Sequence, residues 1–226
     1  MIFQQSFANC VESKMVKVKI CGLTNLEDAE WAAKCGADAL GFILSEKGPR
    51  FIEKDIAASI TGQLPPFVSR VGVFVDEEIE TVKRIAGVCR LDYVQLHGEE
   101  SPDYCDKLRD EINCRIIKAF RVKGSESLEG IKNYFLDSIL LDAWSPEAHG
   151  GCGVSFDWKL ALDVAKNCPI ILAGGLNPKN VADAVRQVHP FAVDVSSGVQ
   201  STARQKDKEK VLKFIREAKG ISGEEN

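Results

Sequence analysis

The segment Val16-Lys17-Val18-Lys19-Ile20-Cys21-Gly22-Leu23-Thr24 decides the fold of this chain. Apolar residues alternate with lysines over residues 16–20, which predicts a strand with one apolar side. Gly22 permits a turn, and a helix is expected next because Thr24 and Glu27 have capping-box spacing. Cys21 therefore lies where a strand ends and a helix begins, a junction that faces the ligand in α/β proteins. Burial as a small apolar residue is an equally good interpretation of this cysteine.

Seven further apolar segments follow the first strand, and a helical segment follows each strand. The eight predicted strands are 16–20, 37–44, 68–75, 93–98, 115–120, 138–142, 169–173 and 191–195. The later helices include 126–135, one capped by Asn177, and the closing helix at 205–219. Because parallel strands need crossover connections, eight such units predict a single (β/α)8 TIM barrel over residues 16–220. An open doubly wound sheet is the alternative, but Gly151-Cys152-Gly153 lacks the third glycine of a dinucleotide fingerprint.

Composition narrows the class of protein further. The chain has 226 residues, 45% of them hydrophobic, and a net charge of −4, so nothing indicates a nucleic-acid partner. No apolar run approaches the roughly 20 residues that cross a bilayer, so we expect no membrane association. The eight cysteines and three histidines form no metal-binding motif, and no secretory signal is evident. We therefore expect reduced thiols in the cytoplasm, no metal, a disordered extension at 1–15 and a tail at 221–226.

In a barrel of this kind, the carboxyl ends of all strands meet at one mouth. Glycine turns after the seventh and eighth strands lie where such barrels hold phosphate, although glycines also simply end strands. An aspartate beside a thiol is half of an acid–base pair, and an arginine fork suits a carboxylate. Taken alone, each of these residues has an ordinary structural interpretation. The aspartate can be a capping or loop residue, the arginine a solvated charge in a loop, and the histidine a hydrogen-bonded residue at the end of a strand. The residues concerned are Cys21, Arg50, His97, Asp142, Gly174, Gly175, Ser197 and Gly198.

The chain resembles the phosphoribosylanthranilate isomerase family of tryptophan biosynthesis over nearly all of residues 16–219. Eight segments carry the similarity, and their order and spacing together make it specific. They are Lys19-Ile20-Cys21-Gly22-Leu23-Thr24, residues 36–42, 71–75, 94–98, Leu140-Leu141-Asp142, Phe156-Asp157-Trp158, residues 172–178 and Asp194-Val195-Ser196-Ser197-Gly198-Val199.

The resemblance implies a cofactor-free Amadori rearrangement of N-(5-phosphoribosyl)anthranilate to an aminodeoxyribulose phosphate. Asp142 would be the general acid for the furanose oxygen, and Cys21 the general base for the C2′ proton. Arg50 would face the anthranilate carboxylate, His97 would line the pocket, and the two glycine turns would hold the phosphate. The chain departs from the family at Gly48, where serine is usual, and at Gln200, where glutamate is usual. A thiol base would need its pKa lowered by a cation or a helix N-terminus.

The residues leave three alternatives open. One is another phosphate-binding barrel enzyme, such as an epimerase or a Schiff-base aldolase using Lys118. A second is activity on a related aminoaldose phosphate of histidine biosynthesis. The third is a non-catalytic ligand-binding barrel, because a fold does not determine a function. For the assembly, we expect a monomer or a homodimer.

Overall fold

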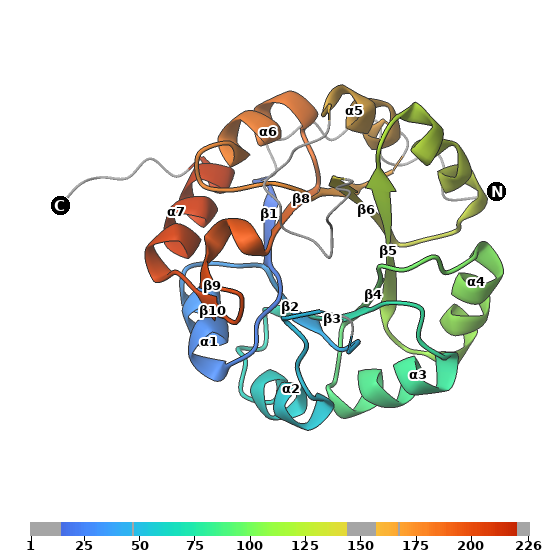
Figure 1. Ribbon diagram of the computed structural model, residues 1–226, viewed down its shortest axis with the longest axis horizontal. Helices are drawn as coiled ribbons and strands as arrows, with labels where there is room; N and C mark the ends of the chain where they lie inside the picture. Colours follow the sequence, from blue (N-terminus) through green and yellow to red (C-terminus); the bar gives the residue numbers. More distant parts are fainter. Residues whose placement is uncertain (1–14, 47, 144–156, 167, 221–226) are drawn as a thin grey trace.

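The computed structural model describes residues 15–46, 48–143, 157–166 and 168–220. Eight parallel strands form a closed barrel in chain order, and β1 pairs with both β2 and β8 (Figure 1). This confirms the predicted (β/α)8 barrel, while residues 1–14 of the expected extension and the tail at 221–226 lie outside the described residues. The strands are β1 (Lys17–Ile20), β2 (Ala39–Ile43), β3 (Ser69–Phe74), β4 (Tyr93–Leu96), β5 (Arg115–Val122), β6 (Ser138–Ala143), β7 (Ile170–Leu172) and β8 (Ala192–Val195).

Helices surround the barrel as an outer ring (Figure 1). Each presents an apolar stripe to the strands, as in α6, where Val181, Ala184 and Val188 are buried at spacings of three and four residues. The α-helices are α1 (Leu26–Lys34), α2 (Lys54–Thr61), α3 (Ile79–Val88), α4 (Pro102–Glu111), α5 (Lys159–Ala165), α6 (Val181–Val188) and α7 (Lys208–Lys219). The α-helix expected at 126–135 is instead a 3₁₀-helix, η1 (Ser125–Asn133), in keeping with a glycine in its interior.

Three predicted helix starts are wrong, and in two of them, at α1 and α7, a nearby side chain takes the capping role. Asn25, not Thr24, caps α1 by accepting a hydrogen bond from the backbone N–H of Asp28, while the Thr24 hydroxyl donates to the carbonyl of Arg204. Asn177 lies in a turn before α6, which begins only after Asn180. The closing helix begins after its cap Asp207.

The residues just before this closing helix form an element that the sequence did not predict. A short antiparallel hairpin, β9 (Gln200–Thr202) and β10 (Gln205–Lys206), follows the one-turn 3₁₀-helix η2 (Ser197–Val199). This hairpin lies beside the carboxyl end of β8, so it belongs to the mouth of the barrel.

Alternation along each strand separates two apolar cores. The larger core lies between strands and helices and takes residues such as Val18, Ile20, Val94 and Leu141. The smaller one fills the lumen and contains Val71, Ile117, Ala119, Leu140, Ile171, Ala173 and Ala192. Along each strand, residues two or four positions from a member of this lumen set also point into the lumen. This rule gives the direction of the strand side chains at the mouth.

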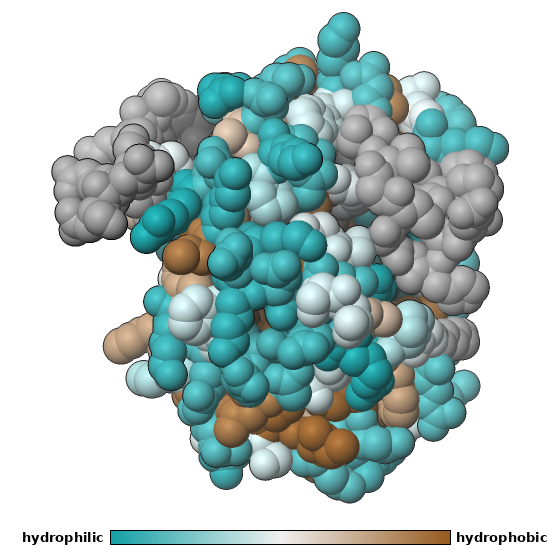
Figure 2. Space-filling view, turned by 60° about the vertical axis from the view of Figure 1, so that its left-hand side comes forward, coloured by the Kyte–Doolittle hydropathy of each residue, from teal (hydrophilic) through white to brown (hydrophobic). Residues whose placement is uncertain are grey.

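The outer surface is mostly hydrophilic on the face shown in Figure 2, with apolar residues gathered near its lower edge.

Several strongly exposed apolar residues lie shortly before strands and so at the amino-terminal end of the barrel: Met15, Phe67, Phe135 and Phe191. No helix within the described ranges is long and apolar enough to cross a membrane.

Candidate functional site

Cys21 follows β1 on the lumen side of the barrel. Val18 and Ile20 belong to the outer core, so Lys19 and Cys21 point inward. A Cβ added to Gly41 of β2 would lie 2.7 Å from the Cys21 sulfur and 3.1 Å from Cε of Lys19. Cys21 is therefore buried, only 6% exposed, and lies inside the lumen at the carboxyl end of β1.

A buried ion pair lies next to this thiol. Lys19 Nζ is 2.9 Å from Asp194 Oδ1 of β8, and the two side chains are 3% and 9% exposed. The alternation over residues 16–20 was predicted correctly. The side that carries Lys19, however, faces the lumen of the barrel and not solvent. Sequence reasoning missed both residues; the available signal was a carboxylate within the apolar run 191–195.

Burial raises the pKa of the Cys21 thiol above its usual value, although Lys19 beside it acts in the opposite direction. The expected lowering of this pKa is therefore wrong. The helix N-terminus is too remote to help, because α1 begins only at Leu26, and loss of hydration outweighs the nearby ammonium.

Asp142 enters the same lumen from β6. Leu140 belongs to the lumen core, so Asp142, two residues later, points the same way. His97 Nε2 lies 3.2 Å from Asp142 Oδ2, and both side chains are about one-fifth exposed (20% and 21%). On the other side of the ring, Gln95 Nε2 is 2.9 Å from His97 Nδ1. The predicted thiol of Cys21 and carboxyl of Asp142 thus point into the same lumen, and His97 contacts the carboxyl.

Arg50 lies over the turn that follows Cys21. A Cβ on Gly22, whose φ is +71°, would approach Cδ of Arg50 to 2.7 Å, so glycine is what permits this contact. Arg50 is 8% exposed, and its Nε donates to Gln200 Oε1 at 3.2 Å. The usual glutamate at position 200 would accept this hydrogen bond through a carboxylate oxygen. Gln200 accepts it through its amide oxygen, so Arg50 keeps its hydrogen-bond partner despite the substitution. Gly48 has a φ of +133°, which favours glycine over serine at this position.

The two glycine turns pack directly against each other. A Cβ on Gly198 would lie 2.0 Å from the carbonyl oxygen of Leu176, which follows Gly174 and Gly175. No residue in the described ranges accepts a hydrogen bond from the backbone N–H of Gly174 or Gly175. Ser197 and Gly198 begin η2 on the adjoining turn. The structure therefore places all four predicted residues on two turns in contact at the carboxyl ends of β7 and β8.

Lys206 in β10 is a second cation that sequence reasoning missed. Its Nζ donates to the carbonyl of Ser196 at 3.0 Å, and its backbone N–H donates to Asp28. Burial lowers the pKa of this ammonium to about 8. No local pattern marks it out, because it stands in the charged segment 204–210. Its burial depends on the hairpin folding back over β8.

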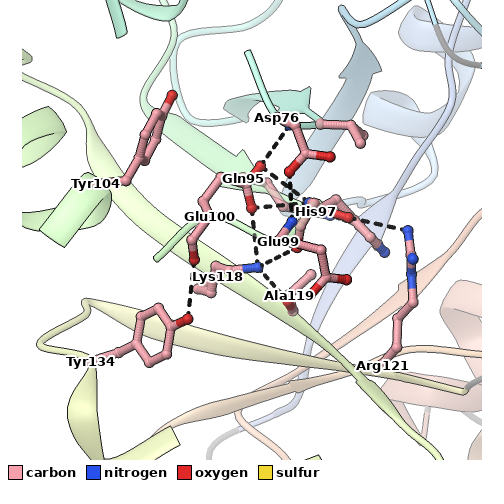
Figure 3. Close-up of polar contacts among 12 residues, drawn as sticks. Asp76, Gln95, His97, Glu99, Glu100, Tyr104, Lys118, Ala119, Arg121 and Tyr134 are labelled. Atoms are coloured by element: carbon pink, nitrogen blue, oxygen red, sulfur yellow. Dashed lines mark hydrogen bonds and ion pairs between the residues drawn. The ribbon is translucent and has the colours of Figure 1, made fainter. Parts of the chain in front are cut away.

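Lys118, the lysine required by a Schiff-base aldolase, points away from the mouth. Its neighbours Ile117 and Ala119 belong to the lumen core, so Lys118 lies on the outer side of β5. Its Nζ is 3.1 Å from Glu100, and the two side chains are 3% and 1% exposed. Figure 3 shows this pair with Tyr134, whose hydroxyl donates to the carbonyl of Glu100. A buried, paired ammonium outside the lumen does not form an imine with a substrate at the mouth.

The described residues contain no cluster of three or more His, Cys, Asp or Glu side chains able to hold a metal ion. The polar groups of the lumen instead pair among themselves, Lys19 with Asp194 and His97 with Asp142.

The described residues form a closed (β/α)8 barrel of the TIM-barrel class, with a thiol, a carboxyl and an arginine at the carboxyl ends of its strands. The family model described as N-(5'phosphoribosyl)anthranilate (PRA) isomerase matches residues 18–217. The chain belongs to the N-(5′-phosphoribosyl)anthranilate isomerase family.

Individual relatives agree with this assignment. The chain is 55% identical to N-(5'-phosphoribosyl)anthranilate isomerase of Geobacter sp. strain M21 over 92% of its own length and all of that protein. The crystal structure of the Thermotoga maritima enzyme superposes with a TM-score of 0.85 at 44% identity, covering 92% of this chain and all of the other. A further structure, at 43% identity and a TM-score of 0.82 with the same coverage, is a complex with reduced 1-(o-carboxyphenylamino)-1-deoxyribulose 5-phosphate.

Proposed function

We propose that this chain isomerises N-(5′-phosphoribosyl)anthranilate to 1-(2-carboxyphenylamino)-1-deoxyribulose 5-phosphate, with Asp142 as general acid and Cys21 as general base. Family membership supports the reaction. The observation that carries the assignment of roles is that Cys21 and Asp142 point into one lumen from strands on different sides of the barrel.

The chemistry needs one proton donor and one acceptor. Asp142 gives its proton to the furanose oxygen as the bond from that oxygen to C1′ breaks, which leaves a protonated Schiff base. Cys21, as thiolate, then takes the proton from C2′, and the electron pair moves into the C2′–C1′ bond to neutralise the iminium nitrogen. The resulting enol-amine becomes the ketone by proton transfer. Lys19 beside the sulfur stabilises its charged form.

The decisive test is a direct assay with freshly prepared N-(5′-phosphoribosyl)anthranilate. The anthranilate fluorescence of the substrate is expected to fall when enzyme is added, and the product, which has the same mass as the substrate, is identified by its ketone. Fluorescence that decays no faster than in buffer would exclude the activity.

Arg50 binds the anthranilate carboxylate in this proposal. Arg50→Ala is expected to raise KM at least about tenfold, since a charge-assisted bidentate contact is lost, with a smaller change in kcat. Steady-state kinetics measure both constants. Arg50→Lys keeps the positive charge but lacks the planar guanidinium, so its KM should lie between those of the wild type and Arg50→Ala. A variant with an unchanged KM and a collapsed kcat would show that Arg50 acts on the reaction instead.

Backbone groups of the turns at Gly174, Gly175, Ser197 and Gly198 hold the phosphate. Gly198→Ala forces the two turns apart, because its Cβ would meet a backbone carbonyl, and is expected to raise KM about tenfold or more through weakened charge-assisted hydrogen bonds. Gly130→Ala is the matched control, since a Cβ there meets no atom within 4 Å. Competitive inhibition by inorganic phosphate should weaken in parallel. An unchanged inhibition constant in Gly198→Ala would place the phosphate elsewhere.

We also propose a homodimer formed through the amino-terminal end of the barrel. Phe67 is 97% exposed and lines an open pocket of about 500 Å³ together with Leu91, Asp92, Tyr93 and Arg115. In a two-fold contact, each copy offers both its projecting Phe67 ring and the open pocket beside it. A Thermotoga maritima relative is described as dimeric.

Phe67→Glu is expected to convert this dimer to a monomer, because burying a carboxylate without a partner is unfavourable. Light scattering coupled to size exclusion measures the mass. Ile56→Glu, at another exposed apolar residue on α2, serves as control and should remain dimeric. A wild-type protein that is monomeric at tens of micromolar concentration would contradict the proposal.

The cytoplasm is the compartment that we propose for this enzyme. The cysteines in the described part of the chain, six in number, are all free thiols, which fits a reducing environment.

A further inference from the structure

Three side chains form a hydrogen-bonded series across the mouth, and its first member has no role in the reaction as described so far. Gln95 belongs to β4, His97 follows it, and Asp142 lies in β6. Val94 and Leu96 belong to the outer core, so Gln95 and His97 point into the lumen. Figure 3 shows the two side chains close together. Gln95 is only 1% exposed, so its amide cannot exchange partners with bulk water.

The donors and acceptors along this series follow from the orientation of the Gln95 amide. Its nitrogen Nε2, which can only donate, faces His97 Nδ1 at 2.9 Å, so Nδ1 is the acceptor in this orientation. A neutral imidazole carries one proton, which therefore lies on Nε2. That N–H donates to Asp142 Oδ2 at 3.2 Å.

We propose that Gln95 is a positioning residue that holds His97 in its Nε2–H tautomer, and so directs the transferable proton of Asp142. With Oδ2 accepting from His97, the proton of the neutral carboxyl is on Oδ1, from which it passes to the furanose oxygen. The carboxylate left behind keeps its hydrogen bond from Nε2–H. This inference rests on the proposed function, in which Asp142 is the acid.

The opposite tautomer would work against the reaction. With the proton on Nδ1, the bare Nε2 would accept the hydrogen bond of the Asp142 hydroxyl and draw its proton away from the substrate. The Gln95 carbonyl oxygen has no hydrogen-bond partner within the described part of the chain. Among the described residues, the amide therefore bonds His97 alone, and this is the bond that selects the tautomer.

Nuclear magnetic resonance of the resting enzyme tests this directly. Two-bond ¹H–¹⁵N correlations of the imidazole rings distinguish the two tautomers, and the His97 signals are assigned by their loss in His97→Asn. The expected spectrum shows His97 protonated on Nε2 alone. A proton on Nδ1, or averaged signals from both tautomers, in the wild-type protein would overturn the proposal whatever the kinetics show.

Gln95→Met then removes the donor while keeping the length of the side chain. It also removes the unpartnered buried oxygen, so the fold is expected to survive. The His97 signals should become those of mixed tautomers, and kcat should fall about tenfold, part of the full contribution of a positioned acid, with KM little changed. Val73→Ala, at the lumen residue of β3 in register with Gln95, controls for altered packing and should leave both constants close to wild type. Unchanged tautomer and kcat in Gln95→Met would refute the role.

The outcomes separate this inference from the function on which it rests. Full activity of Asp142→Asn would remove Asp142 as the acid and with it the role of Gln95, whereas a wild-type enzyme that does not turn over N-(5′-phosphoribosyl)anthranilate would refute the proposed function itself. An inactive Asp142→Asn, together with a wild-type His97 protonated on Nδ1, would leave the function intact and refute only the role of Gln95.

Discussion

Cys21→Ala is expected to lower kcat by a factor of about 10² to 10⁴, the usual contribution of a positioned acid–base group. The thiol is the group proposed to take the C2′ proton, and alanine offers no acceptor in its place. KM should change much less, because the proposed phosphate and carboxylate contacts lie on other residues, and an effect confined to kcat marks loss of transition-state stabilisation. Steady-state kinetics on the purified variant measure both constants.

The matched control for this variant is Cys105→Ala. Cys105 is also buried, 1% exposed, but it lies on α4 in the outer core. It loses the same atom far from the mouth, so its kcat should stay close to wild type. A Cys21→Ala enzyme that turns over substrate at nearly the wild-type rate would remove Cys21 from the mechanism.

The reactivity of the same thiol should depend on pH in a defined direction. Because burial raises the pKa of Cys21, the thiolate fraction is small at neutral pH and grows as the pH rises above the ordinary range of thiols. Alkylation by iodoacetamide, read by mass spectrometry of the peptide holding Cys21, should therefore accelerate into alkaline solution. A plateau already reached below pH 7 would mean that Lys19 outweighs burial.

Asp142→Asn is expected to lower kcat by a similar factor of about 10² to 10⁴, because the amide keeps the shape of the carboxyl but has no proton to transfer. Asparagine can still accept the hydrogen bond from His97, so the geometry at the mouth should persist. Opening of the furanose ring should become rate-limiting, which single-turnover kinetics would show as a loss of Schiff-base formation.

Asp92→Asn is the control for this change. Asp92 pairs with Arg70 at 3.0 Å and immediately precedes β4, so it lies at the opposite end of the barrel. Its kcat should remain near wild type even if stability falls. Asp142→Asn with full activity would assign the acid to another group.

Local sequence was enough to predict the order of the strands and the residues that end them. Apolar runs such as 138–142 and 169–173 predict strands wherever they occur, because a parallel strand covered on both faces must be apolar almost throughout. Eight such runs with crossovers leave few closed arrangements. Cys21, Asp142 and the turns at Gly174 and Gly198 could be placed at the mouth from chain position alone, because the carboxyl ends of parallel strands converge.

Tertiary structure decided which groups of the mouth meet. Lys19 and Asp194 are 175 residues apart, and they pair only because barrel closure joins β1 to β8. Lys118 was excluded from the lumen by the phase of β5, which no residue type could reveal. The pKa of Cys21 was wrongly predicted for the same reason: desolvation depends on how deeply the closed barrel buries the sulfur, and that depth is a property of contacts between strands distant in sequence.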